Sequence, residues 1–144
     1  MIQYPISFSA NAKSVSGIQK VWQFSSQNLQ NECAIPPEFD GPGGAFSPED
    51  LFAQALTNCF VATFKVYAEK SKLMFGEVRV DTELIVDNDE SGKPVMKTCF
   101  LNVIISGCER PDRIRGIAEK AFQSGFIINS VKTDIHFDLE VSGL

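Results

Sequence analysis

The stretch GPGGAFSPEDLFAQALTNCFVATFKVYAEK, residues 41–70, decides the fold of this chain. It opens with a glycine-rich loop and then predicts one long helix, because neither glycine nor proline recurs after Pro48 until Gly76. Ser47 is a natural N-cap, Pro48 fits the first helical position, and Asp50 completes a Ser-x-x-acidic capping box. The stretch therefore predicts a loop followed by a helix that begins at Pro48.

This predicted helix is apolar around nearly its whole circumference. One stripe follows three- and four-residue steps through Phe52, Leu56, Cys59, Thr63 and Tyr67. Apolar residues also fill most of the other faces, at Ala53, Ala55, Phe60, Val61, Ala62, Phe64, Val66 and Ala68. A helix of this kind is covered by other elements or by a second chain. Cys59 thus lies on the most buried element that the sequence offers.

Composition limits the class of protein. A chain of 144 residues is expected to form one domain that buries roughly 68–70% of its unfolded surface. Its 44% hydrophobic and 22% charged residues are typical of a soluble globular protein. The net charge of −5 argues against a nucleic-acid partner, which requires a basic surface. No apolar run is long enough for a membrane span, and the N-terminus lacks the layout of a signal peptide, so we predict a cytoplasmic protein without membrane contact.

The four cysteines are predicted to be free thiols. Cys33, Cys59, Cys99 and Cys108 show no C-x-x-C spacing, and in a reducing compartment thiols stay unpaired. Cys99 shares a predicted strand face with apolar residues and is expected in the core, whereas Cys108 lies in a polar loop and is expected to be exposed. With one histidine, the chain offers a poor ligand set for zinc, and we expect neither a metal nor a cofactor.

The rest of the chain predicts strands around two helical segments. Alternating or β-branched apolar residues indicate strands near residues 2–8, 21–24, 29–34, 78–86, 95–106 and 135–141. A second helix is expected to open at Pro111, and a short helical piece to cover residues 126–131. The order β-β-β-α-β-β-α-β predicts an α+β fold.

One sheet face cannot cover the long helix, which favours a homodimer with this helix near the two-fold axis. A monomer with a second sheet on the other side of the helix is the alternative.

Several of these residues also carry a family resemblance. The glycine-rich loop, the run SPEDLF at residues 47–52, a cysteine ten residues after Glu49 and the tail GFIINSVKTDIHFDLEV at residues 125–141 resemble the OsmC/Ohr family of osmotically inducible and organic hydroperoxide resistance proteins. The resemblance implies a single OsmC-like domain over residues 1–144, with antiparallel sheets around a long central helix in an intertwined homodimer. It also implies the reduction of organic hydroperoxides or hydrogen peroxide by a peroxidatic cysteine, assisted by an arginine and a glutamate and resolved by a second cysteine.

By this resemblance Cys59 is the peroxidatic cysteine and Glu49 is the carboxylate, but two other positions depart from the family pattern. Gly125 stands where the resolving cysteine is expected. No arginine precedes Arg79, so the early cation must be a lysine, with Lys13 the first choice and Lys20 the other. A lysine supplies charge but lacks the planar fork of arginine.

Two hypotheses of function follow. In the first, Cys59 attacks a small peroxide, becomes a sulfenic acid and is resolved by an external thiol reductant or by Cys33, which borders the loop. In the second, the chain is a non-catalytic OsmC-like dimer that binds a small apolar ligand or acts as a thiol redox sensor. Whether the protein is an enzyme, a peroxiredoxin-like hydroperoxide reductase, is left open by the sequence.

The spacing of Glu49 and Cys59 adds a condition on any shared site. Ten helical residues separate their Cα atoms by roughly 15 Å along the helix axis and leave them on faces about 80° apart. A glutamate side chain cannot bridge that distance. If Glu49 serves a thiol, we expect it to serve Cys59 of a second subunit.

Overall fold

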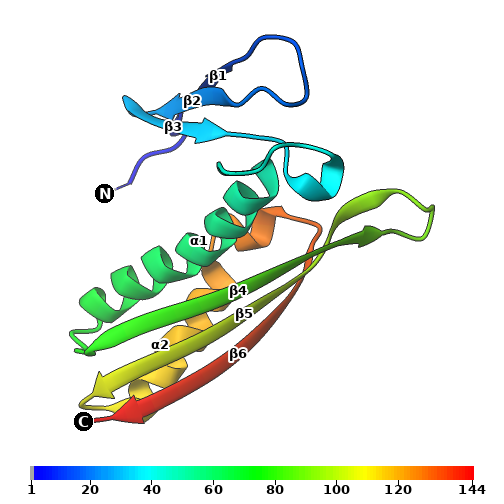
Figure 1. Cartoon of the computed structure of the whole chain (residues 1–144). Helices are drawn as coiled ribbons and strands as arrows, with labels where there is room; N and C mark the ends of the chain where they lie inside the picture. Colours follow the sequence, from blue (N-terminus) through cyan, green and yellow to red (C-terminus); the bar gives the residue numbers. More distant parts are fainter. Residues whose placement is uncertain (1) are drawn as a thin grey trace. The chain divides into compact units, whose positions relative to one another are not determined.

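The computed structural model describes residues 2–144 and shows the predicted α+β element order (Figure 1). The chain divides into two compact units, one up to Leu51 and one from Phe52 to Leu144. None of the helices in residues 2–144 has the length and apolar character needed to cross a membrane. Each unit is described in turn below.

The first unit holds a three-stranded antiparallel sheet. Its strands are β1 (Asn11–Lys13), β2 (Trp22–Ser26) and β3 (Leu29–Cys33), in that order, and a 3-10 helix, η1 (Pro37–Phe39), follows. The strands expected near residues 21–24 and 29–34 are confirmed.

The prediction of a strand near residues 2–8 is wrong, because the first strand starts only at Asn11. Asn11 pairs with Ser25, and the chain then turns from β2 into β3 at Gln27 and Asn28, both with positive φ. The residues before Asn11 therefore have no strand of this sheet opposite them.

The first unit buries very little apolar surface. Its buried residues are Cys33, Ala34 and Ser47. Large apolar side chains stay exposed at Ile2, Tyr4, Ile6, Phe8, Val15, Ile18, Val21, Leu29, Phe39 and Phe46. A three-stranded sheet needs an apolar face packed against something to be stable, so this unit depends on a further surface to cover it.

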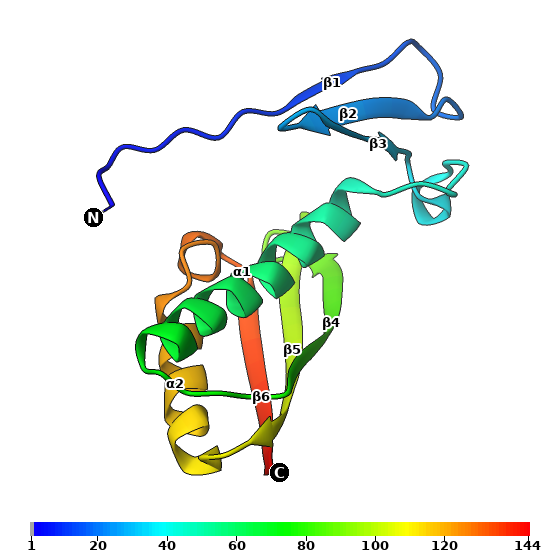
Figure 2. The same cartoon turned by 90° about the vertical axis from the view of Figure 1, so that its left-hand side faces the viewer.

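The second unit is a sheet with two helices on one face. Its strands are β4 (Glu77–Asn88), β5 (Pro94–Cys108) and β6 (Asp134–Gly143), with β5 in the middle. The helices α1 (Pro48–Lys70), whose first turn belongs to the first unit, and α2 (Pro111–Ser124) cover the same face (Figure 2). The short helical piece is a single 3-10 turn, η2 (Ile128–Ser130).

The expectation of antiparallel sheets holds for β1–β2, β2–β3 and β4–β5, whereas β6 runs parallel to β5. The helix α2 explains the difference, because a helical crossover between two neighbouring strands returns the chain in the same direction.

The core of the second unit lies between the helices and the sheet. It contains Leu56, Cys59, Phe60, Phe64, Ala68, Leu73, Cys99, Leu101, Val103, Ile105, Cys108, Ile114, Ala118, Ala121 and Ile128. Cys99 is fully buried, as expected. The expected exposure of Cys108 is wrong, because β5 extends to this residue, which pairs with Gly143 and is 1% exposed.

The long helix buries one face only. Leu56, Phe60 and Phe64 are fully buried, while Ala62 and Val66 are exposed, Val66 to 48%. Ala55 is only half-buried on the same stripe as these two. The sheet therefore covers less apolar circumference than α1 presents, as the sequence predicted.

The start of α1 confirms the predicted capping box. The Ser47 backbone N–H donates to Asp50 Oδ2 at 2.9 Å, and the Asp50 N–H donates to Ser47 Oγ at 3.0 Å. Both side chains of the box are thus occupied with helix initiation. Their neighbour Glu49 takes no part in the box.

Candidate functional site

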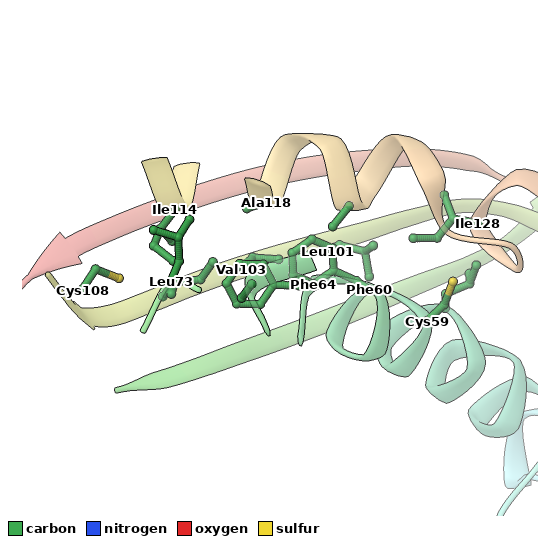
Figure 3. Close-up of a cluster of buried hydrophobic side chains, with 14 of the residues drawn as sticks. Cys59, Phe60, Phe64, Leu73, Leu101, Val103, Cys108, Ile114, Ala118 and Ile128 are labelled. Carbon is green, nitrogen blue, oxygen red and sulfur yellow. The ribbon is translucent and has the colours of Figure 1, made fainter. Parts of the chain in front are cut away.

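Cys59 lies at one end of the core of the second unit. Figure 3 shows it beside Ile128, with Cys108 at the opposite end of the cluster. The residue is 9% exposed. The hydroxyl of Thr63 donates to the Cys59 backbone carbonyl at 2.8 Å and not to the sulfur. Nothing among residues 2–144 forms a hydrogen bond with the sulfur, so the thiol sits in an apolar setting.

The thiol packs directly against the backbone of Gly125. A Cβ added to Gly125 would lie 2.7 Å from Cys59 Sγ and 3.2 Å from Ile128 Cδ1. Gly125 has φ −64° and ψ 130°, a conformation that any residue adopts. A side chain at this position would therefore press on the Cys59 sulfur, whereas the backbone itself would accept any residue.

A hydrogen-bonded turn holds Gly125 and Ile128 over the thiol. The Asn129 N–H donates to the Gly125 carbonyl at 3.0 Å, and Ser130 Oγ donates to the Phe126 carbonyl at 2.6 Å. The turn leaves Phe126 71% exposed and Ile127 42% exposed. Two apolar side chains thus adjoin the glycine that contacts the thiol.

Glu49 is the second residue of α1, and one of its oxygens is unusual. Oε1 is buried and has no hydrogen-bond partner among the described residues. A buried carboxylate oxygen without a donor is unfavourable and requires an explanation. Helix capping does not supply one, because Ser47 and Asp50 satisfy each other. The unbroken helix from Pro48 to Lys70 sets Glu49 and Cys59 about 15 Å apart along its axis, so one chain cannot bring them together.

The candidate cations lie on the first unit. Lys13 is the last residue of β1, opposite Gln23, and is exposed. Lys20 is also exposed, in the connection between β1 and β2. The structure gives neither lysine an ion pair within the described part of the chain. The roles of Lys13 and Glu49 remain predictions.

The other three cysteines are buried and their thiols are held in the neutral form. Burial raises the pKa of Cys99 and of Cys108. Burial also raises the pKa of Cys33, and the negative charges of Glu49 and Asp50 add to this effect. Because the thiolate is the nucleophile, these shifts make all three slow to react at neutral pH. A thiol in the state of Cys33 is a poor resolving group.

Metal binding has no visible basis within residues 2–144. No three histidine, cysteine, aspartate or glutamate side chains gather closely enough there to hold an ion. His136, on the exposed face of the sheet, stacks on Phe100, and its Nε2 lies 3.0 Å from Asp134 Oδ2.

A family model described as OsmC-like protein matches residues 41–140, more than half of the chain. The chain belongs to this family. Among curated relatives, an organic hydroperoxide resistance protein of Xanthomonas axonopodis pv. citri is 25% identical over 137 residues, which cover 94% of each chain. Protein YmaD of Bacillus subtilis is 25% identical over 126 residues, or 85% of this chain and 84% of YmaD.

Solved structures show the same OsmC-like fold. An OsmC-like protein of Vibrio cholerae superposes with a TM-score of 0.82 over 94% of this chain and 99% of its own, at 18% identity. An organic hydroperoxide resistance protein of Elizabethkingia anophelis gives a TM-score of 0.76 over 99% and 100% of the two chains, at 23% identity. At these identities the likeness shows the fold alone.

Sequence reasoning identified Cys59 and, through the position expected for the resolving cysteine, Gly125, but it missed the part played by Ile128. The periodicity of the tail marks Ile128 as apolar, yet it says nothing of which core element the side chain meets. The contact depends on how η2 closes over α1, which is a tertiary feature.

We predict that Gly125→Cys forms a disulfide with Cys59. A Cβ at 2.7 Å from Sγ is close to the roughly 3 Å that an S–S bond of about 2 Å imposes between these atoms. After mild oxidation, thiol titration of the denatured variant should find two thiols fewer than before oxidation, and peptide mapping should join residues 59 and 125.

Gly116→Cys is the matched control, because Gly116 lies in α2 with open space where its Cβ would be. It should keep all its thiols under the same treatment. A Gly125→Cys variant that also keeps every thiol would contradict the observed packing of Cys59 on Gly125.

Proposed function

We propose that this protein is a thiol peroxidase that reduces organic hydroperoxides, or hydrogen peroxide, through Cys59. The Cys59 thiolate attacks the outer peroxide oxygen, the O–O bond breaks, and the leaving alkoxide takes a proton to become an alcohol. Cys59 is thereby oxidised to a sulfenic acid. An external thiol then attacks the sulfur and releases water, and a second thiol reduces the mixed disulfide and restores Cys59.

The packing of Cys59 on Gly125 is the observation that carries this proposal. The residue that faces the sulfur has no side chain and cannot supply a resolving thiol. Cys33 is buried with a raised pKa, which disfavours it for that role. The reductant must therefore come from outside the chain, as the reducing cytoplasm would allow.

The exposed residues beside the site support an organic substrate. Phe126 and Ile127 follow Gly125 directly and present apolar side chains to solvent. An apolar group bonded to the peroxide would be stabilised there by burial. The relatives named for organic hydroperoxide resistance support the same substrate class.

We infer that the working form is a homodimer in which each site is composite. The uncovered stripe of α1 at Ala55, Ala62 and Val66 is apolar and small enough for close packing of a second helix. Glu49 cannot reach Cys59 of its own chain, and its Oε1 lacks a donor. In a dimer this oxygen would accept a hydrogen bond at the partner's thiol site, with Lys13 as the nearby cation.

A non-catalytic role is the second candidate function. No arginine precedes Arg79, and the sulfur of Cys59 has no donor in residues 2–144 to stabilise a thiolate. A dimer that binds a small apolar ligand, or that senses oxidants through Cys59, would have no need of either. Turnover of peroxide distinguishes this role from the first.

The peroxidase proposal predicts that Cys59→Ser abolishes consumption of cumene hydroperoxide at saturating thiol reductant, down to the rate of the buffer. Cys99→Ala, a change at a buried thiol on the opposite wall of the core, should keep most of the activity. A ferrous-xylenol assay with mono- and dithiol reductants measures both. Equal rates for Cys59→Ser and the unaltered protein would rule out the proposed chemistry.

The composite site predicts recovery of activity between two inactive chains. Cys59→Ser loses the nucleophile and Glu49→Gln loses the carboxylate, so each homodimer should be weak or inactive. A heterodimer of the two retains one intact centre in which Glu49 and Cys59 come from different chains. Mixing after denaturation and refolding should restore roughly a quarter of the activity, because half of the dimers are then mixed and each has one of two centres. Absence of any recovery would place Glu49 outside the thiol site.

A further inference from the structure

The sheet of the second unit has an outer face, turned away from α1 and α2, that is strongly acidic. Among the described elements of this unit, none covers that face (Figure 2). Side chains alternate along the strands, so the more buried residues face the helices and the more exposed ones form the outer face. Over residues 77–85, 98–106 and 134–141 the outer face carries one guanidinium, that of Arg79, and six carboxylates. The carboxylates are Glu77, Asp81, Glu83, Asp134, Asp138 and Glu140. With His136 neutral, this face is as negative as the whole chain, whose net charge is −5.

Two large apolar side chains lie in the middle of the acidic outer face. Phe100 and Ile104 belong to β5, the central strand, and Ile104 is 42% exposed. Phe100 stacks on His136 of the neighbouring strand. A surface that only keeps a protein in solution needs charge and has no use for exposed phenylalanine and isoleucine. An apolar centre with a charged rim is instead the anatomy of an interaction surface.

The strand register sets the dimensions of this surface. Asp81 of β4 and Asp138 of β6 flank Asn102 of β5 on its two sides. Neighbouring strands are about 4.8 Å apart, so the acidic rows of β4 and β6 lie roughly 10 Å from each other. Phe100 and Ile104 are separated by four residues, or about 13 Å along the strand. The surface is therefore an apolar strip between two rows of carboxylates.

Most of these carboxylates are free to meet a partner. Arg79 Nε lies 3.0 Å from Asp81 Oδ2, and His136 Nε2 lies 3.0 Å from Asp134 Oδ2. Within residues 2–144 the other four carboxylates of the outer face form no ion pair. Charge complementarity therefore favours a partner rich in lysine or arginine, and it disfavours a nucleic acid or an anionic membrane surface.

We propose that the outer face of this sheet docks a basic amphipathic helix of another protein. A helix about 10 Å wide fits between the two acidic rows. Apolar residues two turns apart on that helix are separated by about 11 Å, close to the spacing of Phe100 and Ile104. Lysines or arginines on either side of them reach the carboxylates of β4 and β6.

The hydrogen bonding of β5 favours a helix over an extended segment. An extended peptide binds a sheet by pairing its backbone with a free strand edge, but β5 is already paired with β4 on one side and with β6 on the other. A helix satisfies its own backbone and docks through side chains alone. Cys59 lies in the core on the opposite side of the sheet, so this docking does not depend on the proposed peroxidase activity.

Fluorescence anisotropy of a labelled model peptide tests the docking on the full-length protein. The probe is a helical peptide of about 18 residues made of leucine and lysine, with the leucines on one face. We expect it to bind at low salt and to weaken as salt is added, because charge pairs contribute to the contact. The same peptide with glutamate in place of lysine should not bind. A peptide of the same composition with two central prolines, which cannot form the helix, should bind at least about tenfold more weakly.

Variants of the outer face locate the contact. Glu83→Gln, Asp138→Asn and Glu140→Gln together should raise the dissociation constant of the lysine peptide about tenfold, because three charge pairs are lost. Ile104→Ser should raise it about fivefold through loss of apolar burial.

The matched control removes the same number of charges from another surface. Glu109→Gln, Asp112→Asn and Glu119→Gln together change three exposed carboxylates at and before α2. This variant should leave the dissociation constant within about twofold. Circular dichroism confirms that each variant has the fold of the unaltered protein.

Each outcome decides for or against the docking. Loss of affinity confined to the outer-face variants supports it. Absence of binding at low salt overturns it, and so does an equal loss in the two triple variants, which would show attraction to net charge alone. Equal affinity for the helical and the proline-containing peptide overturns the helix as the occupant. Peroxide turnover by Cys59 is measured separately, and its failure would leave this inference standing.

Discussion

The burial of the long helix α1 is the constraint on which the rest of the structure depends. Its apolar residues surround the helix, but the sheet of the second unit covers one face, from Leu56 through Phe60 to Phe64. Fully burying each such side chain contributes roughly 1.5–3 kcal/mol, so the exposure of Val66 and Ala62 leaves part of the stabilisation that α1 could provide unused. The same deficit recurs in the first unit, which buries few residues of its own. In the proposed homodimer, a second copy would cover both the exposed stripe of α1 and the exposed apolar residues of the first unit.

The position of Cys59 follows from that burial and sets its chemistry. A thiol at the end of an apolar core, against the backbone of Gly125, is shielded from most of the chain's other groups. In the proposed dimer, Lys13 of the second subunit would supply a cation near the thiol, and Glu49 of that subunit would supply the carboxylate. In the proposed function, Gly125 offers no resolving thiol, so a thiol from outside the chain would resolve the oxidised Cys59.

Much of the fold could be predicted from the sequence, because the relevant signals are local. The capping box at Ser47 and Asp50, the proline at the start of α2 and the alternation in β4 each fix an element without knowledge of the rest. The parallel pairing of β6 and the burial of Cys108 were not predicted. Both depend on where the crossover through α2 delivers the chain, which no local pattern encodes.

The candidate site could be predicted only in part, for the same reason. Cys59 and Gly125 were identified by their place in a family-like pattern, but their contact depends on the closure of the turn at Ile128 over the helix. The strand expected near residues 2–8 shows the opposite limit. Its alternation identifies four large apolar side chains, but the structure leaves them exposed and outside any strand, because a strand also needs a pairing edge that no local pattern encodes.

Trapping of the oxidised thiol tests the central claim most directly. The reduced protein is treated with one equivalent of cumene hydroperoxide in the presence of dimedone, which captures sulfenic acids, and the cysteine peptides are then mapped by mass spectrometry. The account predicts one dimedone adduct, on Cys59, with Cys33, Cys99 and Cys108 unmodified and no disulfide within the chain. An adduct on another cysteine, with Cys59 untouched, or a rapid disulfide between Cys59 and Cys33, would contradict it.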